Sequence, residues 1–267
     1  MQRTCQAVAV NVPVFPLKHS STDIISPQAV LEDWALQNRF DPANWHAKAA
    51  ILVYDRPLHR RLLELHDLQV LDFGAPGSYH SIGATQGRVV LAGDFGIGAP
   101  VAAVVAETLI ASGVNQIVSV GTAGGLQTDL SPGQIISIHG AIRDDGTSYH
   151  YLPSDVAVRP DAQLTARLEA SFGDALGRRG SVWTTDAPFR ETVAELRFHR
   201  DAGVLAVEME AAALMAVCEL RGVAFASSVC ISDVLSEQGW RALFSEPSVR
   251  EALHTMYSAA VTTLTEA

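Results

Sequence analysis

Residues 203–234, GVLAVEMEAAALMAVCELRGVAFASSVCISDV, decide the fold of this chain. The stretch begins with a short apolar run that ends at Glu208-Met209-Glu210, and a helical run rich in Ala, Leu and Met follows. Arg221-Gly222 provides a cationic last turn and a glycine cap, and a second apolar run then ends at Ser232-Asp233. The pattern predicts a strand, a helix and a second strand.

Two carboxylates, Glu210 and Asp233, stand where predicted strands end. Ligands of open α/β sheets bind at the carboxyl ends of the strands, so we expect a site at this edge. Each residue also has an ordinary structural explanation: Glu210 would be favoured at the positive end of a helix, and Asp233 would cap one.

Strands and helices alternate along the rest of the chain. Strands are predicted at 49–54, 78–84, 88–93, 114–120, 134–140 and 179–183, and helices at 58–68, 100–112, 160–172, 191–200 and 248–264. Gln86-Gly87 predicts a hairpin turn. We therefore expect an α/β fold, a three-layer α/β/α sandwich around a mixed, mostly parallel sheet, formed by residues 49–267 as a single domain.

Residues 1–48 are weakly patterned and carry prolines at positions 13, 16, 27 and 42. Ser26-Pro27 can open a helix that runs to Arg39, with Ser26 as the N-cap. We interpret this segment as an arm that packs on the domain or on a neighbouring subunit.

Charge and cysteine content narrow the class of protein. The net charge of −10 argues against a nucleic acid or an anionic membrane as partner. The three cysteines, Cys5, Cys218 and Cys230, form no CxxC motif, which indicates a reducing cytoplasm. Cys218 and Cys230 lie in apolar runs and are expected to be buried thiols. The N-terminus lacks the pattern of a signal peptide, and the uncharged run 108–128 reads as a buried strand with a loop.

Two glycine-rich turns are predicted after strands, Gly96-Ile97-Gly98 and 121–125. Turns without side chains can bring backbone N–H groups close to an oxyanion, although both can also be simple strand-to-helix turns. Val101 occupies the place of the third glycine of a dinucleotide-binding fingerprint, so we do not predict a dinucleotide site. The nine histidines show no metal-binding spacing, no GxSxG is present, and we expect no metal.

The spacing of two of the carboxylates suits a ribose diol. Glu208 and Glu210 lie two residues apart, so on an extended backbone they would face the same way and accept hydrogen bonds from a ribose diol. An acid at the end of a buried strand is costly to leave unpaired, which makes Asp233 a candidate general acid.

At these residues the sequence resembles the superfamily of nucleoside phosphorylases and nucleosidases. The stretches that carry the resemblance are Phe95-Gly-Ile-Gly-Ala-Pro, 117–126 (IVSVGTAGGL), 143–153 (RDDGTSYHYLP), Val207-Glu-Met-Glu-Ala-Ala-Ala and Ile231-Ser-Asp. Segment 143–153 is similar to a motif of uridine phosphorylases, whereas Asp233 is typical of the purine-type members, so a purine is slightly favoured.

The resemblance implies a role for each residue. Glu210, Met209 and Glu208 would bind ribose, and Asp233 would donate a proton to the departing base. Gly96, Gly98 and Thr122 would bind phosphate, and the base would contact Ala123, Gly124, Phe189 and Arg190. Inorganic phosphate would be the co-substrate, without any other cofactor. The family forms dimers and hexamers, so we expect a homodimer or homohexamer in which His19 is one residue able to reach a neighbour.

The departures from the family pattern concern phosphate. The position of the usual phosphate arginine in the second loop is Ser119, and the turn 55–61 carries neither the usual GDPxR nor the glutamate of hydrolytic members. An arginine near Pro76, lent across a dimer in the family, is not evident. Arg56, Arg60 or Arg61 are possible replacements. We therefore expect a nucleoside phosphorylase, with a phosphate-independent nucleosidase or a non-catalytic nucleoside-binding relative as alternatives.

Overall fold

The computed structural model describes residues 14–265, which form one mixed sheet of ten strands with helices on both sides. The strand order is β10-β9-β6-β7-β8-β5-β1-β4-β3-β2. The strands are β1 Ala49–Val53, β2 Leu68–Leu71, β3 Ser78–Ile82, β4 Val89–Gly93, β5 Gln116–Gly125, β6 Ile135–Asp144, β7 Leu176–Thr185, β8 Ala206–Glu208, β9 Ala224–Ser236 and β10 Gly239–Ala242.

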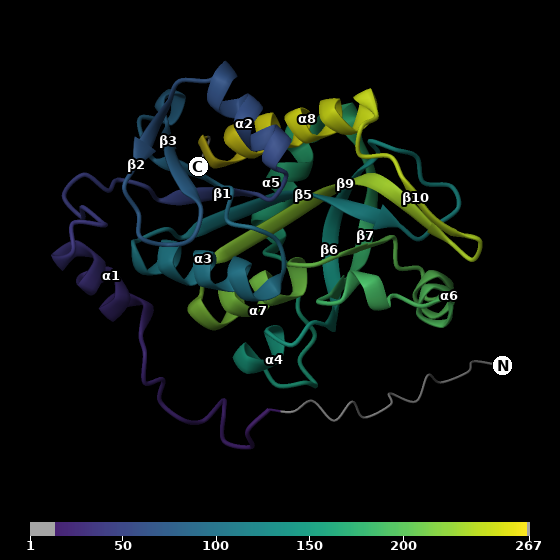
Figure 1. The fold of residues 1–267 in the computed structure, drawn as a ribbon, viewed down its shortest axis with the longest axis horizontal. Coiled ribbons are helices and arrows are strands. Elements are labelled where there is room, and N and C mark those ends of the chain that lie inside the picture. Colours follow the sequence, from purple (N-terminus) through teal and green to yellow (C-terminus); the bar gives the residue numbers. More distant parts are fainter. Residues whose placement is uncertain (1–13, 266–267) are drawn as a thin grey trace.

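The helices form the two outer layers, which confirms the predicted α/β sandwich. The main helices are α1 Pro27–Leu36, α2 Arg56–Leu65, α3 Ala99–Ala111, α4 Ser148–Tyr151, α5 Ala162–Phe172, α6 Val193–Asp201, α7 Ala211–Arg221 and α8 Pro247–Thr265. Figure 1 shows α3 and α7 on one side of the sheet and α2, α5 and α8 on the other. Each side has its own buried apolar cluster, because the central strands are apolar on both faces.

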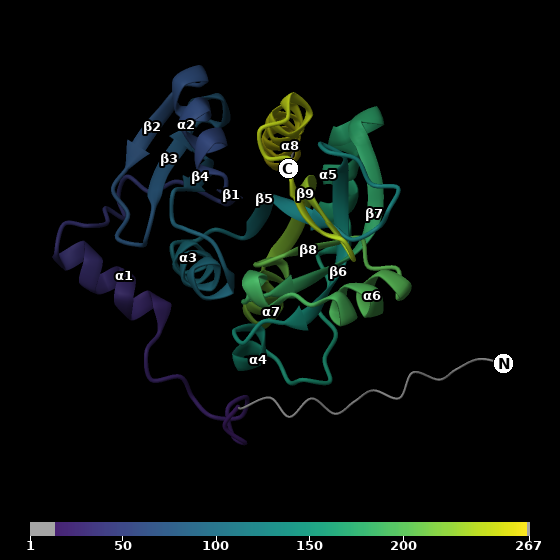
Figure 2. The same ribbon diagram turned by 45° about the vertical axis from the view of Figure 1, so that its right-hand side comes forward.

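The sheet curls so that five of its strands close on one another. β5 pairs in parallel with β9 along its length and in antiparallel fashion with β8 at its end, while β6 and β7 connect β9 back to β8 (Figure 2). In this closure Gly124 of β5 is paired with Val207 on one side and Asp233 on the other. The strand before Glu210 and the strand that carries Asp233 therefore lie on either side of a single residue, Gly124.

The segment 121–125 was wrongly predicted as a turn, because it is the second half of β5. Its glycines serve close packing. A Cβ atom on Gly121 would lie 3.0 Å from Cδ2 of Tyr54, and one on Gly124 would lie 2.4 Å from Cδ1 of Leu235 and 2.9 Å from Oδ2 of Asp233. Only glycine leaves room for these neighbours without a shift.

Other elements also differ from the sequence prediction. The helix predicted at 58–68 is α2, which ends at Leu65, and the chain then forms the edge strand β2. The loop predicted at 143–153 begins inside β6 and contains the short helix α4. The hairpin of β9 with β10 was not predicted. The predicted hairpin of β3 and β4 is confirmed, with Gln86 at a positive φ of 55°.

The described part of the arm, 14–48, contacts its own domain. Ser26 Oγ accepts a hydrogen bond from the N–H of Ala29 at 3.1 Å, as expected for the N-cap of α1, and the helix ends at Leu36, before Asn38 with φ of 56°. Trp34 packs edge-on against Phe73, and a guanidinium N–H of Arg39 donates to the carbonyl of Gly74. His19 lies 3.0 Å from the carbonyl oxygen of Tyr149 in the same chain.

Cys218 and Cys230 are buried free thiols, as predicted, and Cys5 lies outside the described residues. Within residues 14–265 no helix has the length and apolar character needed to cross a membrane.

Candidate active site

A cavity of about 660 Å³ lies at the edge where β5, β8 and β9 end, a volume typical of a small-molecule site. It brings most of the predicted site residues together, including Glu210 and Asp233. The predicted residues that line it are Glu208, Met209, Glu210, Asp233, Thr122, Ala123, Gly124 and Phe189. Gly96, Gly98 and Arg190 are not part of its lining.

Glu210 stands at the N-cap position of α7 and is buried, with 7% of its surface exposed. Its Oε1 accepts a hydrogen bond of 2.6 Å from the N–H of Gly98. This contact uses one of the loop amides expected to hold phosphate, and it links the glycine-rich loop to the start of α7. Burial raises the pKa of the Glu210 carboxyl, and the charge of Glu208 raises it further.

Glu208 has contacts of a different kind. β8 ends at this residue, so the extended backbone expected from 208 to 210 is interrupted by the start of α7. The Glu208 carboxylate accepts the N–H groups of Glu210 at 2.8 Å and Ala211 at 2.7 Å, and also the hydroxyl of Thr184. It thereby satisfies free N–H groups at the start of α7, and holds the backbone of Glu210 in place.

Asp233 lies inside β9, which continues for three residues beyond it, and is 9% exposed. Its Oδ1 accepts the hydroxyl of Ser232 at 2.7 Å, and its Oδ2 accepts the indole N–H of Trp240 at 2.8 Å. The strand has a register shift between Ala123 and Gly124, directly opposite Asp233. This irregularity and the missing side chain of Gly124 give the carboxyl group its space.

Tyr54 is a lining residue that the sequence prediction missed. It follows β1, and its ring packs edge-on against Phe95 with the centroids 5.5 Å apart. Its buried hydroxyl has no hydrogen-bond partner, and burial, with the charges of Glu210 and Glu208, raises its pKa well above the ordinary value. The neutral phenol is therefore the stable form. Tyr54 could have been predicted as a site residue from its position directly after a strand, at the edge of the sheet where the site was expected.

The glycine-rich loop before α3 contributes Ile97 to the lining. Gly96 and Gly98 have φ of 97° and 100°, which favours glycine. Arg56, one of the cations considered for phosphate, pairs with Asp94 of this loop at 2.7 Å, with both side chains half exposed or more. Ser119, at the position of the missing arginine, donates its hydroxyl to Ser227 at 2.7 Å.

The loop before α6 forms another wall. Phe189 is 99% exposed and lines the cavity, whereas Arg190 is exposed outside it. Glu191, which the sequence analysis missed, also lines the cavity and has no hydrogen bond in the described structure. Burial and the charges of Asp233 and Glu195 raise its pKa to about 7. Its neighbour Phe189 was chosen through the family resemblance alone, which did not extend to Glu191.

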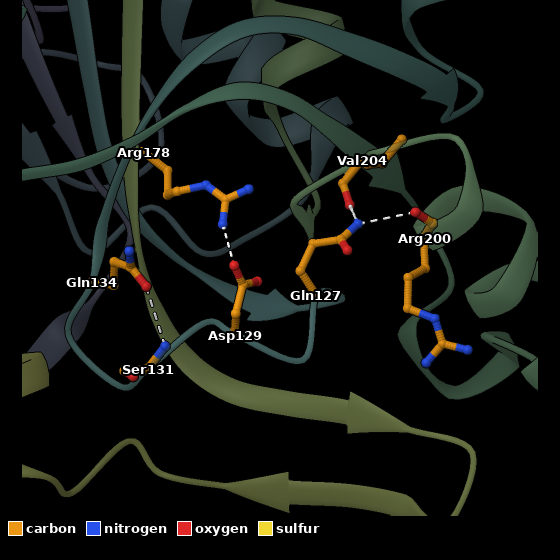
Figure 3. A network of polar contacts seen from close by, with 7 residues as sticks. All are labelled: Gln127, Asp129, Ser131, Gln134, Arg178, Arg200 and Val204. Atoms are coloured by element: carbon orange, nitrogen blue, oxygen red, sulfur yellow. Dashed lines mark hydrogen bonds and ion pairs between the residues drawn. The ribbon is translucent and has the colours of Figure 1, made fainter.

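Trp240 of the β9–β10 hairpin and Phe244, which follows β10, complete this wall. The segment after Asp233 was left unassigned, although its Glu237-Gln238-Gly239 turn between two short runs is a hairpin signal. Glu237 in the turn pairs with Arg197 and, at 2.8 Å, with Arg200 of α6. Figure 3 shows how α6 is itself held: the side-chain amide of Gln127 donates to the carbonyls of Arg200 and Val204.

The ionisable side chains of the lining are acidic. Among the described residues no lysine or arginine lines the cavity, whereas five carboxylates do: Glu191, Glu208, Glu210, Asp233 and Glu237. The lining is suited to hydroxyl and N–H donors and to an aromatic ring.

Comparison with known proteins identifies the family. Residues 49–264 match the model of the phosphorylase superfamily. The chain therefore belongs to this superfamily of nucleoside phosphorylases and nucleosidases, as the sequence resemblance implied.

Curated relatives match over about half of this chain. The guanosine phosphorylase of Halorubrum lacusprofundi is 33% identical over 140 residues, which cover 52% of this chain and 58% of that protein. The uridine phosphorylase of Treponema pallidum is 37% identical over 141 residues, 48% of this chain and 55% of that protein. The matched region therefore spans less than two thirds of either relative, and the two relatives differ in the base that their names specify.

Solved structures support the fold. An AMP nucleosidase from Bacteroides thetaiotaomicron has a TM-score of 0.68 at 20% identity, covering 89% of this chain and 97% of that one. A uridine phosphorylase from Vibrio fischeri has a TM-score of 0.67 at 24% identity, covering 86% and 92%. The fold is thus that of nucleoside phosphorylases and nucleosidases.

Proposed function

We propose that this protein cleaves the N-glycosidic bond of a ribonucleoside, a purine nucleoside in preference to a pyrimidine one, with phosphate as acceptor. The products would be the free base and ribose 1-phosphate. The observation that carries the proposal is that Glu210, which follows β8, and Asp233, within β9, line one cavity of nucleoside size, and that these two strands pair with Gly124 from opposite sides.

The bond would break through a sugar cation, and the residues have separate parts in this step. Glu210 accepts hydrogen bonds from the ribose hydroxyls, Met209 packs under the sugar, and Glu208 holds the backbone of Glu210. Asp233 gives its proton to the base as the glycosidic electrons move into the ring. Positioned acid catalysis of this kind accelerates a reaction by about 10²–10⁴-fold. Ala123, Gly124 and Phe189 line the side where the base would lie, whereas Arg190, which we also predicted to contact the base, is exposed outside the cavity.

Phosphate would approach the opposite face of the sugar, near Thr122 and the loop of Gly96 and Gly98. The support for phosphate is that relatives over half of the chain are named phosphorylases. Arg56, beside this loop, is the cation that we assign to the acceptor. A second copy of the chain is another source of positive charge, and the homodimer or homohexamer stays a prediction.

A specific observation favours a second candidate, hydrolysis. No lysine or arginine among residues 14–265 lines the cavity, and the N–H of Gly98 and the hydroxyl of Ser119 already have protein partners. A neutral water molecule needs no cationic partner, whereas a phosphate dianion would find five acidic side chains and, among the described lining residues, no cation to offset its charge.

The test is base release from a panel of purine and pyrimidine nucleosides, in phosphate buffer and after exhaustive removal of phosphate. We expect release that requires phosphate and yields one ribose 1-phosphate per base, and synthesis of nucleoside from ribose 1-phosphate in reverse. Equal rates without phosphate would replace phosphorolysis by hydrolysis. Tight nucleoside binding without turnover over hours would favour a non-catalytic relative.

A further inference from the structure

The hairpin of β9 and β10 places an aromatic donor against the carboxyl group of Asp233. In its antiparallel register Trp240 is paired with Leu235 and Ala242 with Asp233. The indole N–H donates to Asp233 Oδ2 at 2.8 Å, although 62% of the Trp240 surface is exposed. With the Ser232 hydroxyl on Oδ1, each oxygen of Asp233 has one donor, which fixes the plane of the carboxyl group.

The position of Trp240 is fixed by contacts of the hairpin turn with α6. Glu237, in the turn of the hairpin, is held by Arg197 and Arg200, and these two guanidinium groups lower its pKa to about 2. The hydroxyl of Ser236 donates to the carbonyl of Gly239 across the same turn. Since Gln127 anchors the end of α6 (Figure 3), the hairpin is connected to the body of the domain.

The exposed aromatic surface beside Asp233 is concentrated at the cavity. Phe189 is 99% exposed, Trp240 62% and Phe244 49%, and all three line it. A planar heterocycle placed among these rings would cover apolar surface and lie within reach of the carboxyl group, because Trp240 belongs both to the rings and to the hydrogen bond.

On the basis of the proposed function, we infer that Trp240 is a positioning residue that aims the Asp233 carboxyl group at a ring nitrogen of the departing purine. In the reaction the Asp233 proton passes to that nitrogen, the C–N bond breaks with its electrons retained by the base, and Asp233 becomes a carboxylate. The hydrogen bond from Trp240 strengthens as this charge develops, because hydrogen bonds to ionised acceptors are the stronger ones. The indole thereby stabilises the transition state more than the bound substrate.

If Trp240 supports proton transfer from Asp233, its substitution should affect guanosine and 7-methylguanosine differently. Guanosine needs a proton on its base to leave, whereas 7-methylguanosine already carries a positive charge on the base and needs none. Trp240→Phe keeps an aromatic ring and removes only the N–H donor. We expect it to lower kcat for guanosine about tenfold or more, from the loss of a hydrogen bond to a charged group, with KM changed less than about twofold. For 7-methylguanosine we expect kcat to stay within about twofold of the wild type.

Asp233→Asn is measured alongside and is expected to show the same selectivity more strongly. Trp34→Phe, a tryptophan of α1 that packs on Phe73, is the matched control and is expected to leave the ratio of the two rates unchanged. Suppose that Asp233→Asn slows guanosine more than 7-methylguanosine. If Trp240→Phe then slows both substrates equally, or slows neither, the role inferred for Trp240 is wrong. A wild type that releases no base from any nucleoside of the panel, or an Asp233→Asn variant without discrimination, would instead contradict the proposed function.

Discussion

The two ends of the cavity differ in how completely their polar groups are supported. At the end with Asp233, the carboxyl group has two donors, of which one is the indole of Trp240, and the wall is held by ion pairs to α6. At the end with the glycine-rich loop, the N–H of Gly98 is turned to Glu210, and the nearby cation Arg56 is paired with Asp94. The groups that we propose to break the glycosidic bond are thus held by partners within this chain, whereas those that we propose to hold an anionic acceptor already have other partners.

The largest expected effect is at the bond-breaking end. Asp233→Asn keeps the size of the side chain and removes the proton that leaves with the base, so we expect kcat for an unmodified purine nucleoside to fall about 10²–10⁴-fold. Steady-state base release measures it, with circular dichroism to show that the variant is folded. A fall of less than about threefold would mean that Asp233 is not the general acid, and that the end of the cavity with Asp233 is not where the bond is broken.

Gly124→Ala tests the closeness of the strands that bring both carboxylates together. The new Cβ atom would lie 2.4 Å from Leu235 Cδ1 and 2.9 Å from Asp233 Oδ2. The leucine methyl can rotate away, but the Asp233 oxygen is held by Trp240, so we expect a loss of about 1–3 kcal/mol in the free energy of unfolding and a kcat lowered roughly tenfold. Urea unfolding and kinetics measure these.

Gly140→Ala is the matched control for this substitution, because Gly140 lies in β6 and its Cβ atom would meet nothing closer than Ser181 Oγ at 3.4 Å. An equal loss of stability and activity in both variants would mean that the contact with Asp233 is not what makes Gly124 necessary.

Arg56→Gln tests the acceptor end. If Arg56 attracts phosphate, its loss should raise KM for phosphate about three- to tenfold with KM for the nucleoside unchanged, since an exposed pair contributes modestly. Phosphate titrations at a fixed nucleoside concentration measure the effect, with Arg60→Gln and Arg61→Gln as neighbours on the same helix. An unchanged KM for phosphate would mean that Arg56 does not bind the acceptor, and would favour hydrolysis or a cation from a second copy of the chain.

The smallest effect concerns Glu191, beside Asp233. Its pKa rises from 4.5 to about 7 on folding, so the folded chain binds this proton more tightly than the unfolded chain does. The resulting stability is present below pH 4.5 and is lost as the pH rises through about 7. We therefore expect Glu191→Gln to gain Tm relative to the wild type between pH 5 and pH 8, by a few degrees at most.

Thermal unfolding at several pH values measures this difference. The exposed Glu251 of α8 supplies the control, and Glu251→Gln is measured at the same pH values. A difference for Glu191→Gln that varies with pH no more than that for Glu251→Gln would mean that the Glu191 carboxyl group is not held protonated.

Much of the fold was predictable because its signals are local. The run from 203 to 234 reads as strand, helix and strand in the structure, and Ser26 caps α1 as its type and position predict. The prediction of a turn at 121–125 was wrong. The segment has the composition of a turn but forms a strand, in which its glycines make room for Tyr54, Leu235 and Asp233. Chain neighbours carry no information about such contacts.

The sequence by itself determined the alternation of elements, the family, and the pair Glu210 and Asp233, since each depends on residue type and spacing along the chain. Only the tertiary structure decided which partners these carboxylates have. Glu208 supports the start of α7, Gly98 donates to Glu210, and Trp240 donates to Asp233. The physical reason is that a hydrogen bond between residues 112 positions apart, as between Gly98 and Glu210, depends on the closure of the sheet.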